Sequence, residues 1–512
     1  MTCGLVLCLT VHSFAQVGFQ FFQPVQPPRN IQVMVHRGMW MAAPENSAVA
    51  IAMCHEDFCE WVEVDVRLTR DRQHVLIHNA TVDATTNGTG LVNELTLAEL
   101  QKLDAGSWFA DRFAGTQILS LPEALNLAKG KVNLYLDCKA VDLEILVKDI
   151  LAAEMESQVV VYVGLEDISV VRTLSGGRVA GMTKYRPESM SFESFVERIA
   201  PAVAEIDADR VTSELCRKFH SKGIKVQAKT VGGQRDTADT WGAVIDAGVD
   251  WLQTDDPAGL LFFNARRQLG EFPVKIAAHR GANRYAPENT LPAISLAERL
   301  GMDYAEIDIR TSRDGKQVLL HDSDLDRTTN GQGMVRDLMY AELQEYSTGD
   351  WFCKELEPLR VPSLSDGLEA FGESMRGYLD AKDITPELLV AVIHEHHLAE
   401  RHVVYQSTDY CKALHEIDPQ IRTLPPLRQF SDLDVVAASQ PFGVDARWSI
   451  LSAEMIAACH SKGIQVFSDA LGLYENVEQY QTAISWGIDC IQTDHPLRVL
   501  RAIELLAEKQ VD

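Results

Sequence analysis

Three carboxylates in the first half of the chain are spaced to share one site. Glu63 and Asp65 alternate with valines in residues 62–68, and this alternation predicts a strand that carries both carboxylates on one face. Asp137 precedes Lys139 at the end of another apolar run. Burying adjacent carboxylates without a cation is costly, and an all-oxygen set suits Ca²⁺ or Mg²⁺. The alternatives are a solvated acidic strand face and a simple Asp–Lys salt bridge.

Two histidines each follow an apolar run directly. His36 closes residues 33–35, and His78 closes residues 75–77. A pair of histidines can serve as general base and general acid around a displacement at phosphorus, and Arg37 would add a guanidinium for an anionic group. A single histidine in such a position is more often structural.

The second half of the chain repeats this pattern 243 residues later. The repeat includes the segment Ala-Pro-Glu-Asn, at 43–46 and again at 286–289. Near the end of each copy the offset is 239 residues, from Thr254-Asp255 to Thr493-Asp494. The chain is therefore two homologous units, predicted at residues 31–262 and 275–508. The repeated chemical groups are His279, Arg280, Glu306, Asp308, His321, Asp380 and Lys382.

The elements that must position these groups alternate in type. Short segments rich in β-branched residues alternate with longer helical patterns such as residues 291–300, which predicts βα units and a parallel sheet. About 240 residues built in this way fit a closed (β/α)₈ barrel, the TIM barrel, better than an open sheet. Active sites of such barrels lie at the carboxyl ends of the strands, where the histidines are expected.

Composition and the amino terminus limit the partners and the compartment. The 512 residues carry a net charge of −26 without a Lys/Arg-rich run, which disfavours nucleic-acid binding. Residues 1–15 resemble a signal peptide cleaved after Ala15, and residues 16–30 a linker, so we expect an extracytoplasmic protein. No basic residue precedes Arg29, which argues against the signal, and a buried strand is the alternative. No other run approaches the roughly 20 apolar residues of an integral membrane span.

The ordered motifs of both units resemble the glycerophosphodiester phosphodiesterase family. They are clearest in the second unit, as His279-Arg280-Gly281, Pro287-Glu288-Asn289-Thr290, Glu306-Ile307-Asp308, His321-Asp322, Arg327-Thr328-Thr329-Asn330-Gly331 and Thr493-Asp494-His495-Pro496. The resemblance implies two tandem TIM barrels of the phospholipase C-like phosphodiesterase type. It also implies metal-dependent hydrolysis of a small-molecule glycerophosphodiester to sn-glycerol 3-phosphate and an alcohol.

The resemblance also implies roles for individual residues in each unit. The catalytic acid/base pair would be His279 and His321, with His36 and His78 in the first unit. The metal ligands would be Glu306, Asp308 and Asp380, with Glu63, Asp65 and Asp137 in the first unit. The phosphate-binding residues would be Arg280 and Lys382, with Arg37 and Lys139 in the first unit.

The first unit departs further from the family pattern than the second. Asn79 replaces Asp322, Ala84 replaces Arg327, Ser47 replaces Thr290 and Arg72 replaces Gly315. In both units the third carboxylate is Asp where many family members have Glu. One alternative is that the first unit is a non-catalytic module that binds glycerophosphoryl groups. Another is a lysophospholipase D-like phosphodiesterase, which shares these motifs. The leaving alcohol, the choice of metal and the oligomeric state stay open.

Overall fold

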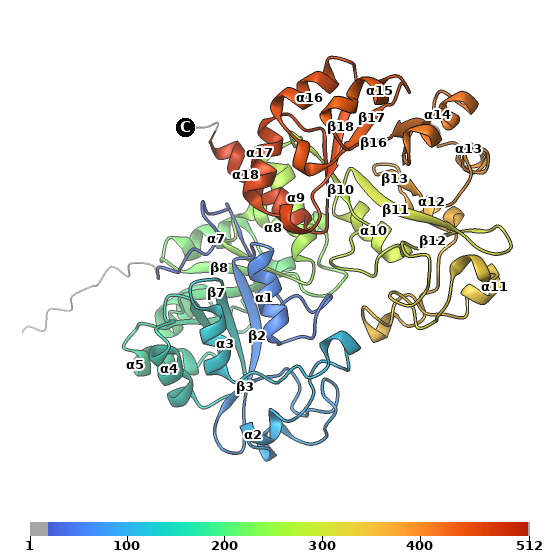
Figure 1. Cartoon of the computed structure of the whole chain (residues 1–512). Coiled ribbons are helices and arrows are strands. Elements are labelled where there is room, and N and C mark those ends of the chain that lie inside the picture. Colours follow the sequence, from blue (N-terminus) through green and yellow to red (C-terminus); the bar gives the residue numbers. More distant parts are fainter. Residues whose placement is uncertain (1–18, 399, 510–512) are drawn as a thin grey trace, which may run out of the picture.

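A computed structural model describes residues 19–398 and 400–509 of the chain. The predicted signal peptide lies outside the described residues. Figure 1 shows two α/β bodies beside each other, one formed by the first half of the chain and the other by the second. In the described part, no helix is both long and apolar enough to cross a membrane.

The first body is a closed barrel. Its eight parallel strands within the described residues pair around a full ring, because β1 pairs with both β2 and β9. A short antiparallel strand, β3 (His74–Leu76), pairs with β2 outside this ring. The ring strands are β1 (Gln32–Val35), β2 (Trp61–Leu68), β4 (Asn133–Ala140), β5 (Val159–Tyr162), β6 (Ala180–Lys184), β7 (Val203–Asp207), β8 (Lys225–Lys229) and β9 (Trp251–Thr254).

The second body is a nearly closed barrel of the same design. The fifth strand of its ring is divided at Pro425 into β15, which pairs with β14, and β16, which pairs with β17. Proline has no N–H to donate, so the ladder is interrupted at this position. The strands are β10 (Lys275–Ala278), β11 (Tyr304–Thr311), β13 (Arg376–Ala381), β14 (Val403–Tyr405), β15 (Arg422–Leu424), β16 (Pro426–Leu427), β17 (Gly443–Ala446), β18 (Gln465–Asp469) and β19 (Cys490–Thr493), with β12 (Gln317–Leu319) antiparallel to β11. The predicted fold of two tandem α/β barrels is confirmed.

Helices connect the strands and cover the outside of each ring. In the first barrel they are α1 (Ala48–Glu56), α2 (Leu97–Leu100), α3 (Leu121–Ala128), α4 (Leu143–Ala152), α5 (Asp167–Ser175), α6 (Phe192–Ser194), α7 (Ser213–His220), α8 (Ala238–Ala247) and α9 (Pro257–Leu269). In the second they are α10 (Leu291–Arg299), α11 (Tyr340–Leu343), α12 (Leu364–Ala370), α13 (Pro386–Glu395), α14 (Thr408–Ile417), α15 (Leu433–Ala437), α16 (Ala453–His460), α17 (Val477–Ser485) and α18 (Pro496–Glu508).

The described part of the predicted linker packs against the amino-terminal end of the first barrel. Trp61 and Trp251 are the first residues of β2 and β9 and are fully buried inside the ring. The Phe21 ring lies 5.3 Å and 4.9 Å from these two indoles, measured between centroids. Arg29 forms ion pairs with Glu60 of the first barrel and Glu504 of the second. The segment therefore closes the end of the barrel that lies opposite the carboxyl ends of the strands.

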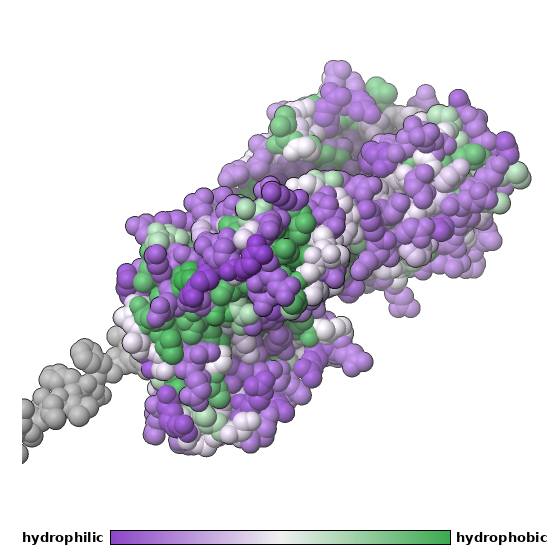
Figure 2. All heavy atoms as spheres, turned by 90° about the horizontal axis from the view of Figure 1, so that it is seen from below, coloured by the Kyte–Doolittle hydropathy of each residue, from purple (hydrophilic) through white to green (hydrophobic). Residues whose placement is uncertain are grey.

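The two barrels share a buried interface. Asp57, after α1, accepts hydrogen bonds from Arg284 Nε at 3.0 Å and from the Tyr285 hydroxyl at 3.1 Å. Phe109 of the first barrel and Phe352 of the second belong to one buried apolar cluster. On the face shown in Figure 2, hydrophobic residues gather in larger patches over the first barrel than over the second.

Candidate active site

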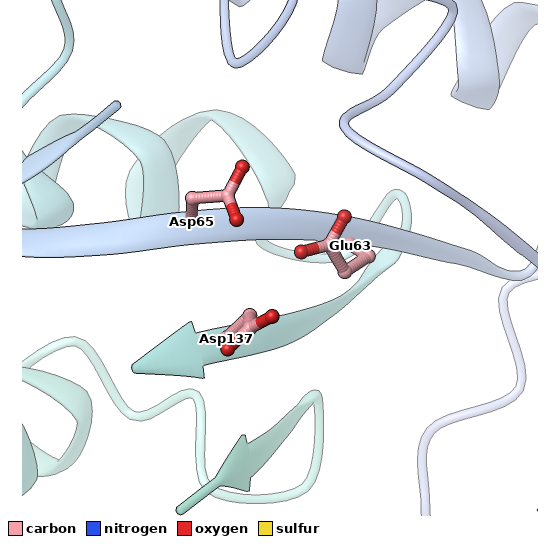
Figure 3. Close-up of side chains that lie close together, drawn as sticks. All are labelled: Glu63, Asp65 and Asp137. Carbon is pink, nitrogen blue, oxygen red and sulfur yellow. The ribbon is translucent and has the colours of Figure 1, made fainter. Parts of the chain in front are cut away.

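The three carboxylates of the first unit meet at the carboxyl end of the ring. Asp65 on β2 lies directly opposite Asp137 on β4, and Glu63 precedes Asp65 by two residues on the same face. Figure 3 shows the three side chains on these neighbouring strands. One oxygen from each lies within 4.8 Å of the other two, and Glu63 and Asp65 are each 1% exposed. The predicted carboxylate set is thus brought together.

The second barrel assembles the same set. Asp308 on β11 lies opposite Asp380 on β13, and the oxygens of Glu306, Asp308 and Asp380 meet the same 4.8 Å limit. Burial, together with the two neighbouring aspartates, raises the pKa of Glu306 well above its ordinary value, and the pKa of Glu63 rises for the same reasons. Three clustered oxygen donors with excess negative charge fit a hard divalent cation.

A lysine offsets part of this charge in each barrel. Lys139 Nζ lies 2.7 Å from Asp137 and 3.2 Å from Asp65. Lys382 bridges Asp380 and Asp308 in the same way. Burial opposes ionisation of Asp308, but Lys382 and the Asn289 amide outweigh it and hold the pKa of Asp308 below its ordinary value. The Asp–Lys salt bridge and the carboxylate cluster are therefore parts of one site.

The first histidine of each pair is oriented by a carboxylate that the sequence analysis did not assign. His36 Nδ1 lies 2.7 Å from Asp255, and His279 Nδ1 lies 2.7 Å from Asp494. The other ring nitrogen, Nε2, lies 3.9 Å from Glu63 in the first barrel. A carboxylate on Nδ1 fixes the ring and leaves Nε2 directed toward the carboxylate set. The repeated Thr-Asp after the last strand was the signal for this role.

The arginine after this histidine adopts a strained backbone in both barrels. Arg37 and Arg280 each have φ of 53°, in the left-handed region. This turn directs the Arg37 backbone N–H to Glu63 at 2.8 Å, and the equivalent bond joins Arg280 and Glu306. The following Gly38 has φ of 75°, and a Cβ there would lie 2.8 Å from the Ala50 Cβ. Glycine is therefore required at the turn.

Each arginine side chain lies between two carboxylates at the site. Arg37 Nη1 donates to Glu45 at 2.9 Å, and Arg280 Nη1 donates to Glu288 at 2.8 Å. Nε of both arginines is buried and has no hydrogen-bond partner among the described residues. Nε lies 3.6 Å from the central aspartate, Asp65 or Asp308, so each guanidinium offsets part of the negative charge of the carboxylate set.

An asparagine holds the central aspartate of each set. Asn46 Nδ2 donates to Asp65 Oδ2 at 2.9 Å, and its Oδ1 accepts from the Asp65 backbone N–H, also at 2.9 Å. Asn289 makes the same pair of bonds with Asp308. The Pro-Glu-Asn segment is repeated in the sequence, but the repeat alone assigns no role to its asparagine. Only the folded chain brings it beside a strand that lies 19 residues away.

The second histidine distinguishes the two barrels. His321 Nδ1 lies 2.7 Å from the Asp322 carboxylate, whereas His78 Nδ1 lies 2.9 Å from the amide oxygen of Asn79. Both histidines follow the short antiparallel strand rather than a strand of the ring. Arg67 and Arg310 on the ring fix the backbone there by donating to the carbonyls of His78 and His321.

Comparison with known proteins gives the family of the chain. A glycerophosphodiester phosphodiesterase of Caldanaerobacter subterraneus subsp. tengcongensis is 33% identical over 241 residues, which are 45% of this chain and 96% of that protein. One from Bacillus subtilis (strain 168) is 28% identical over 246 residues, which are 43% of this chain and 83% of that protein. The crystal structure of a glycerophosphodiester phosphodiesterase from Agrobacterium tumefaciens str. C58 matches 44% of this chain and 98% of its own, with 28% identity and a TM-score of 0.41. The model of the glycerophosphoryl diester phosphodiesterase family matches residues 36–259 and 279–498, so the chain belongs to this family and carries two copies of its domain.

Proposed function

We propose that the chain hydrolyses glycerophosphodiesters to sn-glycerol 3-phosphate and an alcohol. The observation that carries this proposal is the set of groups that recurs at the carboxyl ends of both rings: three carboxylates, an arginine, a lysine and a histidine held by an aspartate. Family membership supports the same reaction, since the matching relatives carry the name glycerophosphodiester phosphodiesterase.

A divalent cation, Ca²⁺ or Mg²⁺, would be held by Glu306, Asp308 and Asp380. When bound, it supplies Lewis-acid polarisation of a phosphoryl oxygen. Arg280 and Lys382 flank the same carboxylates and would bind the remaining phosphoryl oxygens. This arrangement lets an acidic protein bind an anionic diester and stabilises the charge that develops at phosphorus.

The two histidines would transfer the protons. With Nδ1–H donated to Asp494, His279 keeps Nε2 free to take a proton from the attacking nucleophile. His321, held through Nδ1 by Asp322, would give a proton to the departing alkoxide. The balance is one diester and one water converted into one phosphate monoester and one alcohol.

The contact between Asn79 and His78 favours a different role for the first barrel. Asn79 presents a neutral oxygen to His78, where the second barrel presents a carboxylate. An amide stabilises positive charge on the imidazole less than a carboxylate does. The first barrel would then be a slow enzyme, or a module that binds glycerophosphoryl groups without turnover.

The test is product release from glycerophosphocholine by the full-length chain. We expect sn-glycerol 3-phosphate in the presence of Ca²⁺ or Mg²⁺, no product after chelation, and recovery when metal is restored. His321→Ala should lower turnover by the second barrel by about 10²–10⁴-fold, the range for a general acid or base. Turnover that remains after His321→Ala and disappears after added His78→Ala belongs to the first barrel.

His460→Ala is the matched control, because His460 is an exposed histidine at the end of α16 that pairs with Asp489. It should leave turnover unchanged. Full activity in the double variant His78→Ala/His321→Ala at saturating metal would refute the assigned roles.

A further inference from the structure

An open cleft of about 620 Å³ lies between the barrels and reaches the site of the first one. This volume is within the roughly 300–1,000 Å³ of ligand pockets. Much of its wall is aromatic or aliphatic, and both barrels contribute. The residues that give it this character are Trp40, Trp108 and Phe109 from the first barrel and Tyr285, Leu296 and Leu356 from the second.

The cleft reaches two residues at the edge of the first barrel's candidate site. Arg37, whose Nε faces Asp65 at 3.6 Å, also lines the cleft. So does Asn79, whose amide oxygen faces His78. A phosphate bound at Arg37 would therefore leave the rest of a substrate room to extend between the barrels.

At three positions that line the cleft, the equivalent residue of the other unit is an arginine. Met41 and Ala84 line the cleft, and the residues 243 positions later are Arg284 and Arg327. Glu355 of the second barrel also lines the cleft, and its counterpart in the first is Arg112.

Two of these arginines contact side chains of the second barrel. Arg327 donates to Glu288 at 2.7 Å and to Asp322 at 2.6 Å, directly beside His321. The Arg112 guanidinium lies 4.4 Å from the Phe352 ring centroid and 5.5 Å from that of Trp351. The first barrel's cleft has no guanidinium at these three positions, because Met41, Ala84 and Glu355 stand there.

We propose that this cleft binds the aliphatic chain of a single-chain glycerophosphodiester whose phosphate lies at the site of the first barrel. The inference rests on the proposed function of that site and names its substrate class. The second barrel thus completes the substrate pocket of the first. The two barrels then differ in specificity, and the second takes diesters without a long chain.

The test is equilibrium binding to a full-length chain that cannot turn over, His78→Ala/His321→Ala. The probes are glycerophosphocholine, 1-lauroyl-glycerophosphocholine with the chain on the glycerol, and dodecyl glycerophosphate diester with the chain on the alcohol. Calorimetry is done below the micelle concentration of each probe and with metal present. Each buried methylene strengthens binding roughly fourfold, so at least one long-chain probe should bind more than about tenfold tighter than glycerophosphocholine. Which probe gains shows the side of the phosphate on which the chain lies.

Two variants locate the binding to the cleft. Ser295 is exposed on α10 and lines the cleft, so Ser295→Trp fills it without altering the catalytic groups. Ala84→Arg introduces the side chain that the second barrel has at this position. Both should abolish the long-chain preference and leave the affinity for glycerophosphocholine within about twofold. The matched control is Ala52→Trp, at the counterpart of Ser295 on α1, which should keep the preference.

Equal affinities for all three probes would overturn the inference, as would a long-chain preference that survives both Ser295→Trp and Ala84→Arg. A different result would refute the proposed function: no turnover by the chain with its native histidines. A long-chain preference without any turnover by the first barrel would retain the cleft assignment and refute catalysis at that site.

Discussion

At the scale of residues, the clearest difference between the barrels is the side chain that contacts Nδ1 of the second histidine. It is Asn79 beside His78 and Asp322 beside His321. Asn79→Asp gives His78 the carboxylate that His321 has, and we expect kcat of the first barrel to rise about tenfold with little change in KM. The measurement is turnover in a chain whose second barrel is silenced by His279→Ala and His321→Ala. In the second barrel Arg327 pairs with Asp322, and the first barrel has Ala84 at that position. The double variant Asn79→Asp/Ala84→Arg supplies both side chains and is measured beside Asn79→Asp.

The reverse change belongs to the second barrel. Asp322→Asn should lower its kcat at unchanged KM, since the amide supports the protonated ring less well. The first barrel is silenced here by His36→Ala and His78→Ala. If KM moved and kcat did not, Asp322 would act on substrate binding rather than through His321.

Most of the candidate site could be predicted residue by residue because the repeat displays it twice. Alternation with valines placed Glu63 and Asp65 on one face, and the strand register confirms that Asp137 lies beside them. The supporting carboxylate Asp255 could not be placed from sequence. It lies 219 residues from His36, and only closure of the ring between β9 and β1 brings the two together.

At the scale of elements, one buried neutral histidine links β13 to the start of β14. His402 precedes this strand, is 1% exposed, and its Nδ1 accepts a hydrogen bond from the Gly377 backbone N–H. Burial, with Arg401 and His396 nearby, lowers the pKa of His402 from 6.5 to about 3. The unfolded chain binds this proton below about pH 6.5 and the folded chain does not until about pH 3. Stability is therefore full above pH 6.5 and falls as the pH is lowered toward 3.

His402→Asn removes this pH dependence while keeping an acceptor for Gly377. Between pH 7 and pH 4.5, His402 should lower the free energy of unfolding by about 2–3 kcal/mol. The loss of stability over this pH range should be smaller by the same amount in His402→Asn. Denaturant unfolding at the two pH values measures the difference. His397→Asn is the control, because His397 is exposed and has φ of 56°, which asparagine tolerates. An unchanged pH dependence in His402→Asn would contradict the assignment.

The sequence predicted the order of elements better than their pairing. The apolar runs before His36 and His78 look alike, yet one is a ring strand and the other, β3, is antiparallel and outside the ring. Three apolar residues carry no signal that separates these cases. The fifth ring strand of the second barrel is divided at Pro425, a residue that the sequence shows but that the repeat alone does not mark.

At the scale of the whole molecule, the packing of the two barrels could not be predicted from sequence patterns. The repeat describes each unit by itself and carries no information on the contacts between the units. Its buried polar centre joins Asp57 of the first barrel to Arg284 and Tyr285 of the second. The positions equivalent to Asp57 and Arg284 on the other half of the interface are Leu300 and Met41, and both line one cavity. The same surface therefore has a buried ion pair in one half and two apolar side chains beside an open cavity in the other.

This asymmetry predicts how the interface responds to substitution. Asp57 has no exposed side-chain surface, so Arg284→Met leaves a buried carboxylate without its cation and should destabilise the assembled chain by about 3–5 kcal/mol. Adding Asp57→Asn removes the charge and keeps an oxygen for the Tyr285 hydroxyl, so Arg284→Met/Asp57→Asn should recover most of the loss. Thermal unfolding measures both midpoints and shows whether the barrels still melt together. A double variant as unstable as Arg284→Met would mean that direct attraction between the charges, and not the cost of an unpaired buried carboxylate, holds the barrels together.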